Sequence, residues 1–504
     1  MAAAYGVHFG CTSACLAVNK DEKTDVIAND LGDRTTPCIV AFTDHDQAVG
    51  IAAKQGMIRN LQNTVCHVKQ ILGRKCDDPV VTDYKRKSAV QVLDQGGNPM
   101  YEVEIKETRK LYSPLQIAVS IYKKMLETAQ SHGGSGSQDS VLAVPTHFNA
   151  EQKRAISMAA NEAGFNVLRL ISEPSAALLA YDIGQNDITY NRSVLVYRMG
   201  GLSSEVSIVN VHNGMYRILT DVTNSNVGGD MFTNELCKHL VTEFKRKSRC
   251  DISDNKRAMT KLHRQAEICK HTMSKLDNVH CAVDSLYDGI DFDAKVSRAR
   301  YESCISELVQ KCSQFIDQVL TDNNLTRTSV DKVILCGGGT NTPLLQRTMN
   351  DMFSHCDVLS SINPEEVIAV GAAKQAGILS TLEDEDIKLN IQDKEIDCIS
   401  KPICIKTKTG DGIELSPIFP ALAPLHSRKH LEFILQDDQT SFKLDICECI
   451  DQDNIVSLAK VIMRDLPAGS TINSTFHLRR DGHLHITCTE KSSNKTESIT
   501  VEPS

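Results

Sequence analysis

The sequence predicts an α/β protein in which one structural plan occurs twice, followed by a smaller β-domain. Apolar strands flank a Gly-bearing turn at two places about 190 residues apart, and each pair of strands is followed by strand, helix, strand and helix. Period-2 alternation after Leu379 predicts the β-domain. The 504 residues are enough for roughly three compact units.

The two halves of the repeat begin and end with the same order of predicted elements. Strands over residues 5–18 flank the turn Gly10-Cys11-Thr12-Ser13, and strands over 193–211 flank Gly200-Gly201-Leu202-Ser203. The first half closes with a strand over 141–144, a helix capped by Asn149 with Gln152 three residues on, a strand over 167–171 and a helix opening at Pro174. The second half closes with a strand over 333–336, a helix opening at Pro343, a short strand near Val358 and a helix opening at Pro364.

The glycine turns predict a two-lobed phosphate cleft. A turn without side chains lets backbone amides approach an anion closely, and two such hairpins facing each other would enclose it. A single Gly-Gly turn is usually only a turn, but turns at matching positions of a repeated plan are harder to dismiss. The chain has no G-x-x-x-x-G-K-[ST] and no G-x-G-x-x-G after a strand, so a P-loop or Rossmann site is not supported.

Composition excludes several classes of protein. The 55 Lys and Arg against 64 Asp and Glu give a net charge of −9, which does not suggest a nucleic-acid coat or a polybasic membrane binder. No apolar stretch is long enough to span a bilayer, and the N-terminus does not read as an export signal. The 18 cysteines are scattered singly, so we expect reduced thiols, and their spacings do not predict a metal site.

The chain changes character after Leu379. The acidic run Glu383-Asp384-Glu385-Asp386 predicts a solvated linker over 383–391. From 392 to 504 we expect a small β-domain whose last hairpin turns at Asp481-Gly482. Its predicted strands lie over 404–407, 431–434, 442–445, 455–458, 476–478 and 484–486.

Three segments closely resemble the 70-kDa heat-shock chaperone family: Glu173-Pro174-Ser175-Ala176-Ala177, the stretch over 284–292, and Ser297-Arg298-Ala299-Arg300. The resemblance spans nearly the whole chain. It implies an actin-like, ribonuclease H-like duplicated ATPase domain over 1–382, with lobes of about 1–190 and 191–382, and a β-sandwich peptide-binding-like domain over 392–504. The short C-terminus and altered phosphate loops resemble an atypical ribosome-associated member that has no helical lid.

The resemblance assigns ATP or ADP to the cleft. The family's phosphate loops fall on Gly10, Cys11, Thr12 and Ser13, on Gly200, Gly201 and Ser203, and on Gly228 and Gly229. Its adenosine pocket falls on Glu267, Lys270, His271 and Ser274, facing Gly337, Gly338, Gly339, Thr340 and Asn341. The first four stand at i, i+3, i+4 and i+7, so one helical face can present them all. The family's catalytic lysine and glutamate correspond to Lys69 and Glu173.

The departures from the family pattern concern the metal. His8 and Arg198 stand where the family has aspartates, Leu202 replaces a glycine, Cys11 replaces a threonine, and a further acid is kept only as the longer Glu205. Mg²⁺ prefers an octahedron of oxygens that carboxylates orient, so we expect weak or absent magnesium binding. At roughly 5 Å and an effective dielectric constant of about 20, a guanidinium gains around 3 kcal/mol per phosphate charge before desolvation. We therefore predict ATP binding with slow or absent intrinsic hydrolysis.

The resemblance also implies partners. The ribosome-associated member pairs with a J-domain protein of the zuotin type and acts on nascent polypeptides at the ribosome, which would place this chain in the cytosol, partly on ribosomes. We expect no membrane and no sequence-specific nucleic acid as partners. The run Lys245-Arg246-Lys247-Ser248-Arg249 is the best candidate for ribosomal RNA contact, although charge runs are usually solvated faces. Charges interrupt the predicted linker at Ile387-Lys388-Leu389-Asn390-Ile391, so coupling between the domains is in doubt.

Two other functions compete with this interpretation. The chain could be a nucleotide-independent scaffold or cochaperone subunit in which His8 and Arg198 reflect drift. It could also be a small-molecule phosphotransferase on the same fold, which would need a carboxylate base in the cleft. The loss of carboxylates at positions 8 and 198 disfavours the phosphotransferase.

Overall fold

The structure is a computed structural model of the chain. It describes residues 3–502 except 22, 134–137, 186–191, 213, 381–398, 400, 410–411, 421–422, 424, 426, 437–438, 452–453, 480 and 494. The chain divides into two compact units, Met1–Gln392 and Asp393–Ser504. The predicted linker over 383–391 lies outside the described residues. In the described part of the chain, no helix has the length and apolar composition needed to cross a bilayer.

The first lobe of the first unit is built on a mixed sheet ordered β12-β11-β1-β2-β3, with β4 on β2. Strand β1 pairs in parallel with β11 and antiparallel with β2, and all its residues are buried, as a continuous apolar strand requires. The strands are β1 (Ala4–Phe9), β2 (Ser13–Lys20), β3 (Lys23–Val26), β4 (Thr35–Pro37), β11 (Asp139–Val144) and β12 (Asn166–Ser172).

The second lobe repeats this arrangement on a sheet ordered β15-β14-β13-β18-β19. Again the first strand pairs antiparallel with the next strand in sequence and in parallel with a later one. The strands are β13 (Arg192–Met199), β14 (Ser204–His212), β15 (Met215–Asn224), β18 (Lys332–Cys336) and β19 (Asp357–Leu359). The repeated plan predicted from the sequence is confirmed by the matching strand orders.

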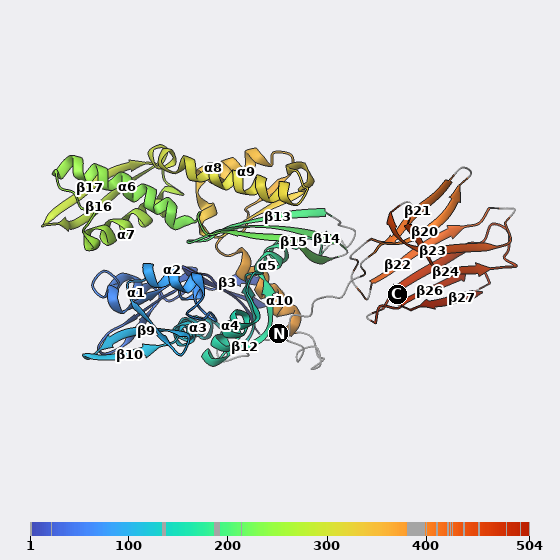
Figure 1. Cartoon of the computed structure of the whole chain (residues 1–504), viewed down its shortest axis with the longest axis horizontal. Coiled ribbons are helices and arrows are strands. Elements are labelled where there is room, and N and C mark those ends of the chain that lie inside the picture. Colours follow the sequence, from blue (N-terminus) through green and yellow to red (C-terminus); the bar gives the residue numbers. More distant parts are fainter. Residues whose placement is uncertain are drawn as a thin grey trace. The chain divides into compact units, whose positions relative to one another are not determined.

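Two helices, α5 (Glu173–Ala180) and α10 (Val367–Ser380), join the lobes (Figure 1). Their buried side chains share one hydrophobic cluster with apolar residues of both sheets. The helices cross closely, because a Cβ at Gly371 would lie 1.7 Å from the carbonyl oxygen of Ala176. Gly6 of β1 packs on α10 in the same way, because a Cβ there would lie 2.0 Å from the backbone nitrogen of Ala373. This central layer fixes the two sheets, and therefore their hairpin turns, relative to each other.

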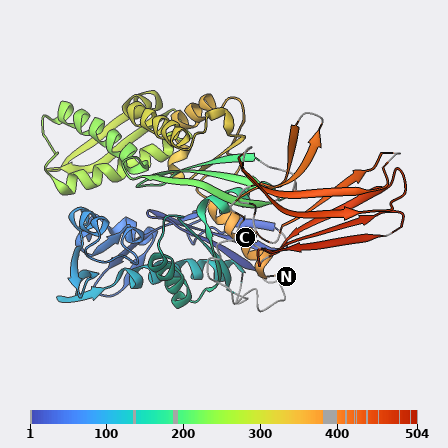
Figure 2. The same ribbon diagram turned by 45° about the vertical axis from the view of Figure 1, so that its right-hand side comes forward.

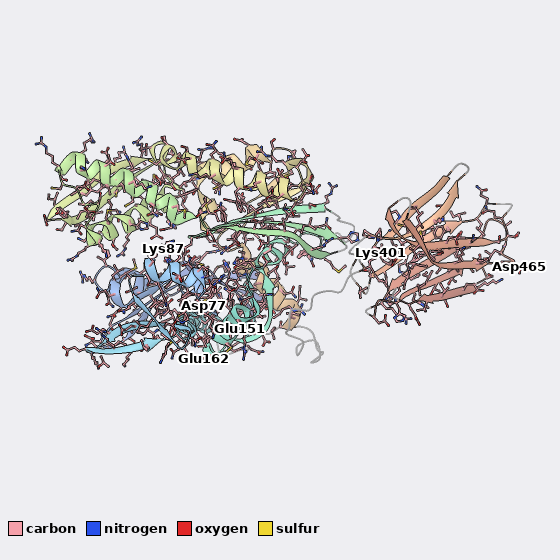
Figure 3. All side chains as sticks on the ribbon, viewed as in Figure 1. Asp77, Lys87, Glu151, Glu162, Lys401 and Asp465 are labelled. Atoms are coloured by element: carbon pink, nitrogen blue, oxygen red, sulfur yellow. The ribbon has the colours of Figure 1, made fainter. Side chains whose placement is uncertain are left out.

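Other helices cover the outer faces of the lobes. Helix α4 (Ala150–Ala163) begins with the predicted capping box of Asn149 and Gln152. Charged side chains of α2 and α4, including Lys87, Glu151 and Glu162, are exposed on the first lobe (Figure 3). The remaining helices are α1 (Ile51–Gly56), α2 (Pro79–Lys87), α3 (Pro114–Gly133), α6 (Gly229–Ser248), α7 (Lys256–Met273), α8 (Arg298–Asp322) and α9 (Pro343–Met352), with 3-10 turns η1 (Leu61–Asn63), η2 (Val68–Gln70), η3 (Arg327–Ser329) and η4 (Gly338–Asn341).

Three small sheets complete the lobes. Two of them, ordered β6-β5-β7 and β10-β9-β8, belong to the first lobe, and a hairpin of β16 and β17 belongs to the second. Their strands are β5 (Ile39–Phe42), β6 (Gln47–Val49), β7 (Thr64–Cys66), β8 (Gln91–Gln95), β9 (Asn98–Ile105), β10 (Thr108–Tyr112), β16 (Asn278–Tyr287) and β17 (Ile290–Ser297).

One helix begins later than predicted. The sequence predicts a helix opening at Pro364, but α10 begins at Val367. The side-chain oxygen of Asn363 accepts a hydrogen bond from the backbone N–H of Glu365, and its carbonyl accepts one from Glu366. These bonds close a turn ahead of the helix, as asparagine side chains often do.

The second unit consists of two four-stranded antiparallel sheets, ordered β21-β20-β23-β24 and β22-β25-β26-β27 (Figure 2). Apolar side chains from both sheets form one core. Every regular element among its described residues is a strand, and each predicted strand overlaps one of them. The strands are β20 (Ile403–Thr409), β21 (Gly412–Phe419), β22 (Ser427–Ile434), β23 (Phe442–Asp451), β24 (Asn454–Met463), β25 (Thr471–Leu478), β26 (Leu484–Glu490) and β27 (Thr496–Val501).

The crossing of α5 and α10 predicts a strong effect for Gly371→Ala. The added methyl group would overlap backbone atoms of Ala176, which cannot move aside as a side chain can. We expect the free energy of unfolding to fall by about 2 kcal/mol or more, measured by chemical denaturation. Gly56→Ala is the matched control, because a Cβ at Gly56 meets no atom within 4 Å. Equal stability of the two variants would contradict the packing described above.

Candidate functional site

The two predicted glycine turns have the same local geometry and face each other. In the turn between β1 and β2, the N–H of Gly10 donates to the carbonyl of Ser13 at 3.0 Å. In the turn between β13 and β14, the N–H of Gly200 donates to the carbonyl of Ser203 at 2.9 Å. A Cβ at Gly201 would lie 2.3 Å from the Thr12 side chain, so the turns of the two lobes are in contact.

The other predicted glycines close around the second turn. The N–H of Gly229 donates to the carbonyl of Gly200 at 2.9 Å, and a Cβ at Gly228 would strike the backbone of that turn. Gly337 has a φ of 82°, and a Cβ there would lie 2.4 Å from the carbonyl oxygen of Met199. Gly339 packs equally closely on the Met199 side chain. The fold therefore brings together four segments that are far apart in the sequence.

Beside the turns lies a buried ion network centred on Glu173, the first residue of α5. Its Oε1 accepts a hydrogen bond from Lys69 Nζ at 2.9 Å and lies 3.4 Å from His8 Nε2. Its Oε2 lies 2.9 Å from Arg198 Nε, and Arg198 Nη1 donates to Glu205 Oε1 at 2.8 Å. His8, Lys69 and Glu173 belong to the first lobe, whereas Arg198 and Glu205 belong to the second. The network therefore ties the lobes together through charge.

The charges of this network balance. Burial alone would raise the pKa of Glu173, but Arg198, Lys69 and His8 outweigh burial and hold this pKa well below its usual value. Burial lowers the pKa of His8 despite the nearby Glu173, so the imidazole is neutral near pH 7. Two cations, Lys69 and Arg198, then face two carboxylates, Glu173 and Glu205. We conclude that Arg198 is not a free cation but is neutralised by its two partners.

The network retains capacity for a polar ligand. Among the described side chains, His8 Nε2, Glu173 Oε2 and Arg198 Nε are buried atoms without a hydrogen-bond partner, although the last two are in close charge contact. Buried polar groups are usually hydrogen-bonded, so these atoms suit water molecules. An Arg198 N–H could also donate to a phosphate oxygen, whereas the Glu173 carboxylate oxygen can only accept and would repel it. A divalent metal fits less well, because Arg198 already holds both carboxylates. No group of three or more His, Cys, Asp or Glu among the described residues is arranged to hold a metal ion.

The predicted adenosine residues are only partly gathered at the turns. Lys270 of α7 reaches them, since its Nζ donates to the carbonyl of Gly229 at 2.8 Å. His271 is more than half exposed, and Ser274 Oγ donates to the carbonyl of His271 at 2.7 Å. Thr340 is buried within the 3-10 turn that ends at Asn341. Lys270 is thus the member of this helix that the structure places against the glycine turns.

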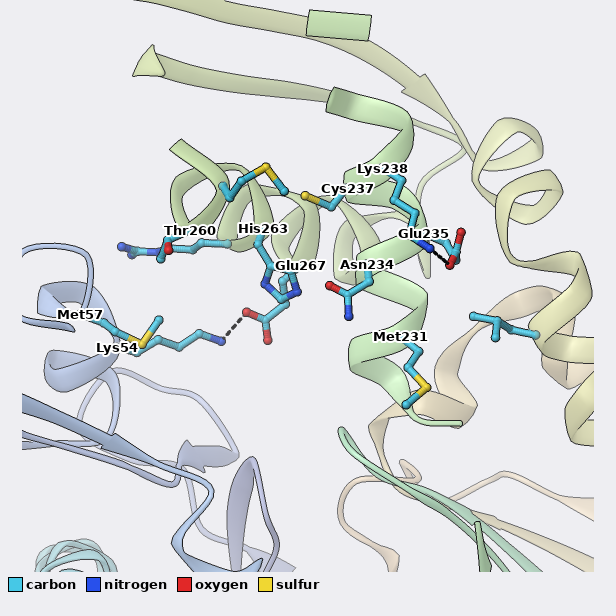
Figure 4. Close-up of a pocket in the computed structure, with 13 residues that line it drawn as sticks. Lys54, Met57, Met231, Asn234, Glu235, Cys237, Lys238, Thr260, His263 and Glu267 are labelled. Carbon is cyan, nitrogen blue, oxygen red and sulfur yellow. Dashed lines mark hydrogen bonds and ion pairs between the residues drawn. The ribbon is translucent and has the colours of Figure 1, made fainter. Parts of the chain in front are cut away.

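Glu267 instead bridges the lobes. Its carboxylate forms an ion pair with Lys54 Nζ at 2.9 Å across a cavity of about 650 Å³ (Figure 4). The cavity is lined by α1 on one side and α6 and α7 on the other, with the thioethers of Met57, Met231 and Met259 on its walls. The ion pair is partly exposed, so it contributes roughly 1 kcal/mol or less.

Sequence reasoning missed two carboxylates near the site. A Cβ at Gly338 would lie 2.3 Å from Glu365 Oε1, and burial raises the pKa of Glu365. Asp221 lies at the boundary of the lobes, where it accepts hydrogen bonds from Thr146 and Ser207. Acidic residues near helix starts and in edge strands are common, so neither position gave a signal in the sequence.

The basic run over 245–249 is locally paired in the structure. Lys245 forms an ion pair with Asp251 and Arg246 with Glu243, each at 2.7 Å. Lys247 donates to the carbonyl of Asp293 and lies over the Phe292 ring. These contacts are typical of a solvated helix end and weaken the argument for an RNA contact there.

Comparison with known proteins gives a match over nearly the whole chain. The family model described as "Hsp70 protein" matches residues 4–504. The chain is 46% identical over 504 residues to "Heat shock 70 kDa protein 14" of Danio rerio, covering 99% of both chains. It is 43% identical over 509 residues to the Bos taurus protein of that name and 42% over 508 residues to that of Homo sapiens, again with 99% of each chain covered.

The ion network predicts a large effect for Glu173→Gln. The neutral amide would leave Lys69 and part of the Arg198 charge buried without compensation, so we expect the free energy of unfolding to fall by about 3 kcal/mol at pH 7.5. Glu307→Gln is the control, because the Glu307–Lys311 pair is exposed and should contribute roughly 0.5 kcal/mol or less. Denaturation curves that coincide for the two variants would contradict the network.

Proposed function

Because the chain belongs to the Hsp70 family, we propose that it is an atypical chaperone of this family that binds ATP, hydrolyses it slowly and assists nascent polypeptides at the ribosome with a J-domain partner. The full-length likeness to heat shock 70 kDa protein 14 relatives supports the chaperone assignment. The observation that carries the altered nucleotide chemistry is the contact of Arg198 with both Glu173 and Glu205.

Nucleotide binding is supported by the family and by the site. The Hsp70 family implies ATP or ADP as a ligand. The glycine turns offer backbone amides, Lys69 and Arg198 offer cationic groups, and Lys270 lies beside Gly229. A triphosphate would have to compete with Glu173 for the two cations, which reduces the electrostatic gain expected from Arg198 alone. We infer that ATP binds but less tightly than an unpaired guanidinium would allow.

Slow hydrolysis follows from the same contacts. Hydrolysis requires a positioned water molecule and groups placed to meet the developing charge, and loss of one such group typically costs about 10²–10³ in rate. Lys69 and Glu173 would carry the residual activity, as charge stabiliser and water organiser. Glu173, however, is already in contact with Lys69, Arg198 and His8. These contacts leave the Glu173 carboxylate little capacity to orient a water molecule.

Magnesium is the part of the family's chemistry that this site does not fit. Carboxylates are missing at positions 8 and 198, and the guanidinium of Arg198 lies between the two that remain. A metal ion would have to displace it, at the cost of leaving a buried guanidinium unpaired. We propose that magnesium binding is weak or absent.

The second unit supports an interaction with polypeptides. Its two antiparallel sheets with a common core suit the β-sandwich peptide-binding-like domain expected of the family. We propose that it contacts nascent chains, that a J-domain protein of the zuotin type is the partner, and that the complex acts in the cytosol on ribosomes. The likeness to an atypical ribosome-associated member is what supports these partners.

A second candidate, a nucleotide-independent scaffold, is favoured by one observation. The ion network balances its own charges and ties the lobes together through side chains of the chain itself. A small-molecule phosphotransferase is less well supported, because the carboxylates of Glu173 and Glu205 are paired with cations rather than available as bases.

Calorimetric titration with ATP tests the proposed nucleotide chemistry. We expect binding both with magnesium and with a chelator, with dissociation constants that differ less than about threefold, because Arg198 and not a metal ion balances the carboxylates. Absence of both heat and a thermal shift of unfolding in the two conditions would rule out nucleotide binding and favour the scaffold.

The double variant His8→Asp, Arg198→Asp tests whether these two residues cause the weak magnesium binding and slow hydrolysis that we propose. It should regain magnesium-dependent binding and measurable ATP turnover, and adding Lys69→Ala should remove that turnover. A double variant that stays inactive would contradict the view that the site is intact and only its metal chemistry is altered.

Sedimentation of cytosolic extract on a sucrose gradient tests the proposed partners. We expect the chain to migrate with ribosomes and a J-domain protein. Replacing Lys245, Arg246 and Lys247 with alanine should leave this migration unchanged, because these side chains are locally paired. Migration of the native chain alone, away from both partners, would contradict the proposal.

A further inference from the structure

A carboxylate that the ion network does not use lies at the boundary of the two lobes. Asp221 is on β15, the edge strand of the second-lobe sheet, and is directly opposite Ser207 of β14 in the antiparallel register. The strands β14 and β15 lie along the side of the second lobe that faces α5 (Figure 1). Asp221 is partly buried there, between the sheet and the loop that follows β11.

The Asp221 carboxylate accepts one hydrogen bond from each lobe. Its Oδ2 accepts from Oγ1 of Thr146, in the first-lobe loop between β11 and α4. Its Oδ1 accepts from Oγ of Ser207 at 2.5 Å. A neighbouring contact also joins the two lobes, since Thr223 Oγ1 lies 3.4 Å from Nδ1 of His147. One carboxylate therefore joins the loop of the first lobe to the sheet of the second.

The surroundings of Asp221 are unfavourable for its charge. Burial is the largest cause of a raised pKa, and the carboxylates of Glu205 on β14 and Glu173 on α5 add to it. The Ser207 hydroxyl and Arg198 on β13 oppose this change only in part, so the pKa is raised to about 6. The same loop carries His147, whose pKa burial lowers below its usual value.

We propose that Asp221 is an interlobe latch, which holds the loop containing Thr146 against β14 and β15 through its hydrogen bonds to Thr146 and Ser207. A protonated carboxyl group can keep both bonds, because its O–H donates to one hydroxyl while its other oxygen accepts from the second. None of the groups in the latch belongs to the glycine turns, although the charges of Glu173, Glu205 and Arg198 act on Asp221. The latch would determine how readily the two lobes separate.

The direction of the pH effect follows from linkage. When the lobes separate, Asp221 becomes hydrated and its pKa returns towards the usual value, so protons bind more tightly to the closed form. Lowering the pH therefore favours closure, and raising it through about 6 loosens the latch. With these two pKa values, opening should be about tenfold more frequent at pH 7.5 than at pH 5.0.

Hydrogen exchange of the full chain, followed by mass spectrometry at both pH values, tests the latch. Peptides covering 140–149 and 215–224 report on the two sides. Thr146→Val removes the interlobe hydrogen bond without changing charge or shape, and should speed exchange on both sides about fivefold. Ser207→Ala removes the bond within the second lobe and should affect mainly the peptide over 215–224. Asp293→Asn, at an exposed position, is the control for a lost carboxylate.

The pH dependence of hydrogen exchange distinguishes the contribution of Asp221 from that of its neighbour His147. After correction for the intrinsic effect of pH on exchange, the native chain should open about tenfold more often at pH 7.5, whereas Asp221→Asn should show no such change. His147→Gln should behave as the native chain does. Unchanged exchange in Thr146→Val, or native pH dependence in Asp221→Asn, would overturn the latch. Loss of the pH dependence in His147→Gln would also overturn it.

Discussion

A single buried carboxylate determines what this site can do. Glu173 lies at the start of α5, where Lys69 and His8 contact one oxygen and Arg198 contacts the other. A buried carboxylate must be paired, and here Lys69 and Arg198 supply the opposite charge. Arg198 brings its own second partner, Glu205, so the charges balance across both lobes. The contact between the lobes at this centre follows from this arrangement, and the proposed nucleotide chemistry rests on it.

The repeated fold makes this pairing possible. Each sheet carries its hairpin turn on the first two strands of the repeat, and α5 and α10 cross between the sheets at Gly371 and Ala176. Close packing at that crossing fixes the distance between the turns, and therefore the distance between Glu173 and Arg198. Further contacts between the lobes occur at Lys54 and at Thr146. They add links between the lobes to the close-packed core at the crossing of α5 and α10.

Local signals in the sequence predicted most of the fold. The capping box at Asn149, the glycine turns and the alternating strands after residue 400 depend on neighbouring residues, which is why they could be identified. The start of α10 was misplaced because a side chain of Asn363 closes a turn ahead of the helix. The structure describes no part of the predicted linker, so that prediction stays open.

The site was predicted less completely, because its properties depend on contacts between distant residues. The sequence placed Arg198 in the cleft and suggested a free cation that attracts phosphate, but only the fold reveals that Glu173 and Glu205 neutralise it. Glu365 and Asp221 carry no motif, and their positions follow from the crossing of elements far apart in the chain.

We propose that Arg198 occupies the place where a metal ion would otherwise balance the carboxylates of Glu173 and Glu205. Crystals grown with ATP and Mn²⁺, measured at the manganese absorption edge, test it most directly, because anomalous scattering locates the metal ion. We expect a nucleotide in the cleft, the Arg198 guanidinium still in contact with Glu173 and Glu205, and no anomalous peak between them. A manganese peak beside Glu173 with Arg198 displaced would contradict this role of Arg198.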